Sequence, residues 1–163
     1  MTKLDDRALM WWFRECWGVP AEIAGSLSEE ENLEYGKALL IAANGDGKIT
    51  DAERDWILGY ASISGCSPEN IEILSAYRGE DDFEDLFTRG AQQGAQRVCI
   101  CDAIRACGSD GELASEEVAA VHKMAERLSV PASVVNEYVE IYKAEQALKA
   151  RRIGLAFPNA SGS

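Results

Sequence analysis

A repeat of 64 residues constrains the fold of this chain more than any other feature. Sliding the sequence by that distance superimposes identical residues at five positions: Ala42 on Ala106, Asp46 on Asp110, Gly47 on Gly111, Glu53 on Glu117 and Ala61 on Ala125. Apolar segments with helical spacing lie on either side of both Asp-Gly pairs. Each copy alone would leave an apolar face uncovered. The repeat therefore predicts two helix-loop-helix halves packed about a pseudo-two-fold axis, with the two Asp-Gly turns near each other.

The apolar spacing is helical nearly everywhere, and no run of alternating β-branched residues is bounded by hairpin turns. Two pairs of residues have the spacing of capping boxes, which mark helix starts: Ser28 with Glu31, and Thr50 with Glu53. The segments 38–42 and 98–104 are apolar on all sides, which is typical of helices at the centre of a bundle. The predicted fold class is all-α, a single bundle-like domain of about eight helices with an internal pseudo-two-fold repeat.

The 163 residues suffice for one domain, which we divide into three parts. The predicted parts are an N-terminal aromatic helix packed on the core (1–27), the helical domain (28–155, with repeats at about 31–78 and 92–144) and a flexible tail (156–163). The aromatic side chains of the first helix are too large to leave exposed: Trp11, Trp12, Phe13 and Trp17. A further short helix is expected over 82–88.

Acidic residues outnumber basic ones by 28 to 16, which gives a net charge of −12. This charge repels nucleic acid and anionic bilayers over most of the surface and favours cations and basic protein partners. We expect contact with a membrane only through partners. The first six residues show no secretory signal, so the expected location is the cytoplasm.

The cysteines and the single histidine do not predict a site. The five cysteines are odd in number and lie in apolar helical patterns, so we expect buried, reduced thiols. Cys99 and Cys101 are two residues apart and point in different directions on a helix, which favours core packing over metal binding. His122 has no evident partners for a zinc site or a catalytic triad, so we expect it to pack or face solvent.

The segment 44–50 with Glu53 resembles an EF-hand calcium loop, in which oxygen ligands alternate before a glycine and a glutamate closes the site. Counting back from Gly47 places Ala42 at the first ligand, and Ala106 occupies the same position in the second copy. Paired EF-hands also follow each other at a shorter spacing. An EF-hand-like calcium sensor is therefore one alternative function.

The duplicated pattern more closely resembles the TerB-like family of tellurite resistance proteins. The resemblance covers about Glu31 to Ala144. It depends on two motifs: Asp46-Gly47 with Glu53, and Asp110-Gly111-Glu112 with Glu116-Glu117. It implies an all-helical, non-catalytic accessory protein of tellurite resistance and stress response.

The same resemblance implies divalent cation binding, with calcium as the candidate ion, through acidic residues at the two turns. The implied ligands are Asp46, Glu53, Asp110 and Glu117, with Asn44 and Glu116 as additional oxygen donors. A purely structural role competes with this hypothesis. Aspartates in such turns bond the turn backbone, and a glutamate at the third position of a helix completes a cap.

Asp102 interrupts the second all-round apolar segment, where a carboxylate is costly unless it is paired. Arg105, three residues later, is the simplest partner. If Asp102 instead faces a cavity lined by the tryptophans of the first helix, its pKa would rise, and the chain would be a small-molecule-binding protein or an enzyme. That is the second alternative function.

Overall fold

A computed structural model describes residues 3–19, 27–83, 86 and 95–158. The described residues form seven α-helices and two 3₁₀ turns: α1 (Lys3–Trp17), α2 (Glu29–Ala43), η2 (Asn44–Asp46), α3 (Asp51–Ile63), α4 (Pro68–Ala76), α5 (Ala95–Cys107), η4 (Gly108–Asp110), α6 (Ser115–Arg127) and α7 (Ala132–Ala156). The predicted all-α class is confirmed. The short helix expected over 82–88 and most of the tail expected over 156–163 lie outside the described residues.

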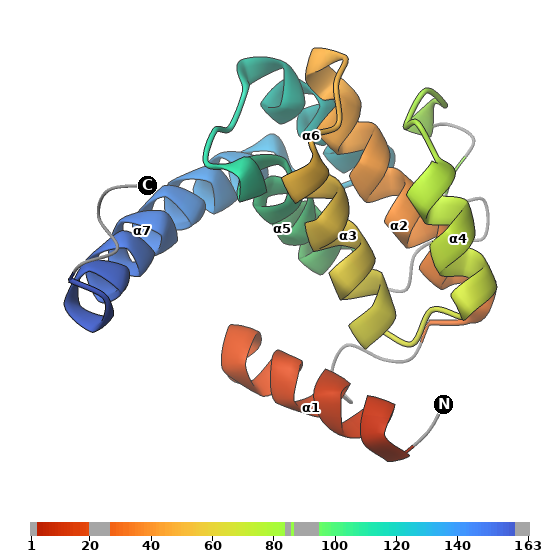
Figure 1. The fold of residues 1–163 in the computed structure, drawn as a ribbon. Helices are drawn as coiled ribbons and strands as arrows, with labels where there is room; N and C mark the ends of the chain where they lie inside the picture. Colours follow the sequence, from red (N-terminus) through yellow and green to blue (C-terminus); the bar gives the residue numbers. More distant parts are fainter. Residues whose placement is uncertain (1–2, 20–26, 84–85, 87–94, 159–163) are drawn as a thin grey trace.

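The helices form one bundle, from which the C-terminal half of α7 extends as an arm (Figure 1). Helices α2 and α5 contact each other, and both contact α3 and α6. Helix α1 packs across α3. In the part of the chain that the structure describes, no helix combines the length and hydropathy that a membrane crossing needs.

The predicted repeat is present in the backbone. Each half consists of a helix, a 3₁₀ turn and a second helix, and the bounds of η2 and α3 recur 64 residues later in η4 and α6. Gly47 and Gly111 end the two turns with φ angles of +91° and +103°. Because this left-handed region is strained for residues with a Cβ, the paired glycines are required by the turn itself.

The capping signals also mark the helix starts correctly. The Ser28 hydroxyl accepts a hydrogen bond from the Glu31 amide, and the Glu31 carboxylate accepts one from the Ser28 amide. Thr50 and Glu53 make the same reciprocal pair at the start of α3. These bonds satisfy backbone donors that a helix leaves free at its first turn.

The core lies between the two apolar helices, as predicted. Leu39 and Leu40 of α2 and Ile100 of α5 have no exposed surface. The expectation for the first helix holds only in part, since Phe13 is buried but Trp11 is 60% exposed. Consecutive residues of a helix point about 100° apart, so an aromatic run of this length cannot turn every ring inward.

The two halves interlock through their turns. The η2 turn packs on α6, and η4 packs on α3, so each turn contacts the second helix of the other half. A Cβ added to Gly45 would lie 2.8 Å from both the Glu116 carbonyl oxygen and the Glu117 Cα. This close approach brings the acidic residues of the two repeats together.

Candidate functional site

Two buried glutamates meet where the halves interlock. Glu53 is 1% exposed and Glu117 is 4% exposed, and their carboxyl groups are hydrogen-bonded to each other. Glu53 Oε2 also accepts hydrogen bonds from the Thr50 amide at 2.6 Å and from the Thr50 hydroxyl at 2.8 Å. Glu117 Oε2 accepts one from the Ala114 amide at 2.8 Å. Each glutamate thus caps its own helix and bonds to its repeat counterpart.

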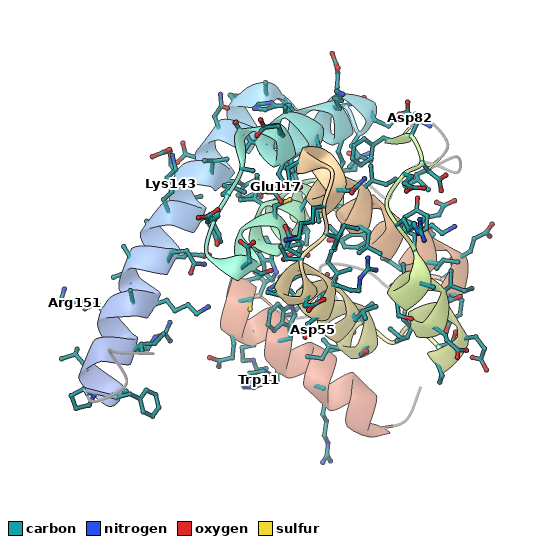
Figure 2. The ribbon with its side chains drawn as sticks, turned by 45° about the horizontal axis from the view of Figure 1, so that its top comes forward. Trp11, Asp55, Asp82, Glu117, Lys143 and Arg151 are labelled. Atoms are coloured by element: carbon teal, nitrogen blue, oxygen red, sulfur yellow. The ribbon has the colours of Figure 1, made fainter. Side chains whose placement is uncertain are left out.

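The glutamate pair holds a proton at neutral pH. Burial, followed by the hydrogen bond to Glu53 and the charges of Glu53 and Asp46, raises the pKa of Glu117 to about 8. The amide of Ala114 acts in the opposite direction. A hydrogen bond between two carboxyl groups needs one proton, because ionised carboxylates are acceptors only. Figure 2 shows Glu117 inside the bundle, whereas Lys143 extends outward from α7.

The two turn aspartates make matching local bonds. Asp46 Oδ1 accepts a hydrogen bond from the Lys48 amide, and Asp110 Oδ1 accepts one from the Glu112 amide, both at 2.9 Å. These bonds span two residues and are those of Asx turns. Both aspartates therefore have a structural task in the turn.

The two additional oxygen donors also have other contacts. The Asn44 side-chain amide donates to the Gly79 carbonyl at 3.2 Å and thereby fastens the η2 turn to the connection after α4. Glu116 is exposed and accepts a hydrogen bond from the Ser115 hydroxyl. Of the six predicted ligands, the structure brings Glu53 and Glu117 into direct contact, with Asp46 close enough to act on Glu117 through its charge.

The acidic side chains at the two turns do not form a ready-made metal site. Across residues 3–19, 27–83, 86 and 95–158, no three or more His, Cys, Asp or Glu side chains are grouped so as to hold one. The EF-hand alternative is not supported by any observation. Ala42 and Ala106, at its first-ligand positions, are fully buried in the apolar core. The geometry as it stands is that of a protonated carboxyl pair flanked by two Asx turns.

Asp102 is fully buried, and the sequence did not predict which residue donates a hydrogen bond to it. Tyr35 donates a hydrogen bond to Asp102 Oδ2 at 2.8 Å. The predicted partner Arg105 is 4.0 Å from Asp102 Oδ1 and makes its closer ion pair, at 2.9 Å, with Glu145. Burial raises the pKa of Asp102 to about 6, and the bond from Tyr35 opposes this rise. Asp102 is part of a buried polar network, and it does not line the pocket formed by Trp12, Trp56 and Arg105.

None of the five cysteine thiols is in a disulfide, and each has a raised pKa. Burial raises the pKa of Cys66 to about 11 and of Cys101 to about 12, and it raises the pKa of Cys99 and Cys107 well above the ordinary value. Burial likewise raises the pKa of Cys16, against the charge of Arg105. Because the thiolate is the nucleophile, these thiols react poorly with soft electrophiles.

We therefore expect a disulfide reagent such as dithiobis(nitrobenzoate) to label the folded protein at least roughly 100-fold more slowly than the urea-unfolded protein near neutral pH. Mass spectrometry of the labelled sites would assign each rate to one cysteine. Rapid labelling of any cysteine in the folded protein would show that its thiol is exposed and activated.

Comparison with known proteins supports the sequence-based assignment. No family model matches the chain, and no curated protein matches it significantly. A crystal structure of a tellurite resistance protein from Nostoc punctiforme matches it with a TM-score of 0.77 and 29% sequence identity, covering 100% of both chains. Together with the duplicated acidic turns and the interlocked halves already described, this match shows that the chain is similar over its whole length, in sequence and in fold, to a tellurite resistance protein, in agreement with the predicted resemblance to the TerB-like family.

Proposed function

We propose that this protein acts in tellurite resistance and the associated stress response as a non-catalytic accessory protein of the cytoplasm. The whole-length similarity to the Nostoc punctiforme protein supports the resistance role. The chemistry of the described residues supports a non-catalytic one, because the turn acids make cap and turn bonds and the thiols have raised pKa values. Cells that lose the gene should become more sensitive to tellurite, and the restored gene should reverse this. Unchanged tolerance would remove the resistance role.

The acidic surface supports binding to basic protein partners. A cavity of about 470 Å³ lies beside the η2 turn, and four acidic residues line it: Glu80, Asp81, Asp82 and Glu116. The chain as a whole has a net charge of −12. Complementary charge of this kind accelerates association and selects partners of opposite sign.

The second part of the proposal is a divalent cation site at the interlocked turns. The observation that supports it is the pair of buried carboxyl groups contributed by Glu53 and Glu117, one from each repeat. Asp46 and Asp110 would have to move from their turn bonds toward the glutamates, since no three such side chains are grouped in the described residues, and would then supply further carboxylate oxygens, the ligands preferred by hard cations such as calcium. The cation would have to displace the shared proton, so its binding should strengthen as the pH rises and should release a proton.

Calorimetric titration with calcium chloride tests the cation site. At physiological ionic strength the wild type should show saturable binding, tighter at pH 8.5 than at pH 7, and heats in two buffers of different ionisation enthalpy should reveal about one released proton. The double variant Asp46→Asn with Asp110→Asn should lose this binding.

A matched control replaces Asp51 and Asp55, two exposed acids of α3, by asparagine, and this variant should bind like the wild type. Equal loss in both double variants would show only a nonspecific effect of net charge. No binding heat in the wild type would leave the four acids as cap and turn residues. The resistance role would stand, since it rests on the whole-length similarity.

A further inference from the structure

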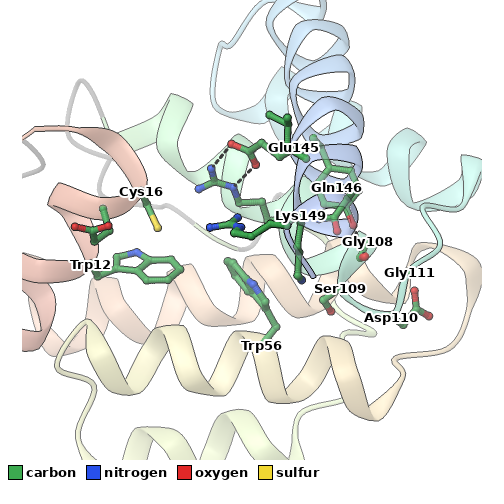
Figure 3. A pocket seen from close by; sticks show the side chains of 15 residues that line it. Trp12, Cys16, Trp56, Gly108, Ser109, Asp110, Gly111, Glu145, Gln146 and Lys149 are labelled. Atoms are coloured by element: carbon green, nitrogen blue, oxygen red, sulfur yellow. Dashed lines mark hydrogen bonds and ion pairs between the residues drawn. The ribbon is translucent and has the colours of Figure 1, made fainter. Parts of the chain in front are cut away.

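A pocket lies between α1, α3, α5, η4 and α7, with the turn residue Asp110 in its wall. Its cavity volume is about 670 Å³, within the range usual for small-molecule sites. Figure 3 shows Trp12 and Trp56 along one wall and Lys149 reaching inward from α7. Of the residues used in the proposed function, Asp110 alone is among those that line this pocket.

Three side chains of the pocket wall have a buried polar atom without a hydrogen-bond partner in the described part of the chain: Trp12 Nε1, Arg105 Nη1 and Ser109 Oγ. Arg105 Nη1 faces the buried Asp102 Oδ1 at 4.0 Å. Trp12 Nε1 is a donor and the Ser109 hydroxyl can donate, and leaving a buried donor unpaired costs free energy. A ligand that brought acceptor oxygens to these two groups would remove that cost.

The charges of the wall favour an anion. Lys149 and Arg152 make no ion pair with any described residue, and both line the pocket. The acids beside them are largely engaged, since both oxygens of Glu145 accept hydrogen bonds from Arg105 and Asp110 Oδ1 accepts the amide of Glu112. Glu15 completes the carboxylates of the wall, which thus has three acidic and three basic side chains. Lys149 and Arg152, one helical turn apart on α7, make the α7 side of the wall cationic.

The aromatic wall favours a ligand with a flat apolar body. Trp56 stacks on Tyr60 with ring centroids 5.7 Å apart, and Trp12 meets the same ring edge-on at 6.1 Å. This three-ring cluster fixes the two indoles beside the cavity. Fixed aromatic faces bind planar apolar groups without the entropic cost of ordering flexible side chains.

We propose that this pocket binds an aromatic organic anion. Its ring system lies along Trp12 and Trp56, and its carboxylate or other acidic group takes charge-assisted hydrogen bonds from Lys149 and Arg152.

The test uses 2-naphthoate and its neutral analogue 2-naphthamide as probes, followed through the indole N–H signals in NMR spectra. Naphthoate should shift the signals of Trp12 and Trp56 in a saturable way and leave that of the exposed Trp11 unchanged. Naphthoate should bind at least roughly tenfold more tightly than naphthamide, because only the carboxylate makes charge-assisted bonds. Replacement of both Lys149 and Arg152 by glutamine should abolish that preference.

The matched control is Arg151→Gln, which removes an exposed cation of the same helix turn that does not line the pocket. This variant should keep the full preference for naphthoate. Equal binding of the two probes, an equal loss in the control, or no saturable shift of Trp12 below roughly 10 mM probe would overturn the proposal. Because all three substituted residues lie on the exposed surface of α7, thermal unfolding of both variants should match that of the wild type.

Discussion

Replacing Gly79 by alanine should lower the free energy of unfolding by about 2–5 kcal/mol. Gly79 has a φ of +68°, where a residue with a Cβ is strained. The added Cβ would also lie 2.5 Å from the Leu40 carbonyl oxygen and 3.0 Å from the Asn44 Cβ. Neither residue can move away easily. Leu40 is buried in the core, and the Asn44 side chain is hydrogen-bonded to the Gly79 carbonyl. Urea unfolding followed by circular dichroism measures the loss.

The control for this substitution is Gly59→Ala. Gly59 lies within α3, and an added Cβ there would have no heavy atom within 4 Å. Alanine has a higher helix propensity than glycine, so this variant should be as stable as the wild type or more stable by up to about 1 kcal/mol. If both alanine variants had the stability of the wild type, the close packing of the connection after α4 onto the η2 turn would be wrong.

The second large effect concerns pH. The wild type should lose stability between pH 6 and pH 8, at up to about 1.4 kcal/mol per pH unit, and Glu117→Gln should remove most of this slope. In the folded protein the pKa of Glu117 is raised to about 8, above its unfolded value, so the folded state holds more protons than the unfolded state in this range. A group of this kind stabilises the fold at low pH and loses that contribution as the pH rises through the folded pKa. Urea unfolding at several pH values measures both slopes.

Two features separate this effect from other titrations. Asp102 also has a raised pKa, of about 6, so most of its contribution changes below the chosen range. Glu116→Gln removes an exposed carboxylate next in sequence to Glu117 and should keep the wild-type slope. An identical slope in the wild type and in Glu117→Gln would mean that the glutamate pair shares no proton.

The sequence predicted the local structure of the repeats well. The fixed offset, the glycines of the turns and the capping pair Thr50 with Glu53 are short-range signals, and each is found where expected. The contact between Glu53 and Glu117 was not predicted as a carboxyl pair, because spacing along the chain does not say which side chains meet across a pseudo-symmetry axis. The duplication itself was the usable signal, since equivalent residues near such an axis approach each other.

The other differences between prediction and structure concern residues whose partners lie far away in the sequence. Arg105 was the expected partner of Asp102 because it lies one helical turn away, but Tyr35, 67 residues distant, donates the hydrogen bond. Similarly, Asn44 was assigned as an oxygen donor for a cation, whereas its amide holds the Gly79 carbonyl. The pocket beside Trp12 and Trp56 combines residues of five elements, and no local pattern connects them.

The most direct test of the account is a titration of the glutamate side chains by carbon-detected NMR, with Glu53→Gln and Glu117→Gln used to assign the two carboxyl signals. The Glu117 carboxyl should still be mostly protonated at pH 7 and titrate near pH 8, and replacing Glu53 by glutamine should shift this titration. A Glu117 carboxyl that titrates below about pH 5, like an exposed glutamate, would contradict the shared proton and with it the joining of the two repeats through their acidic caps.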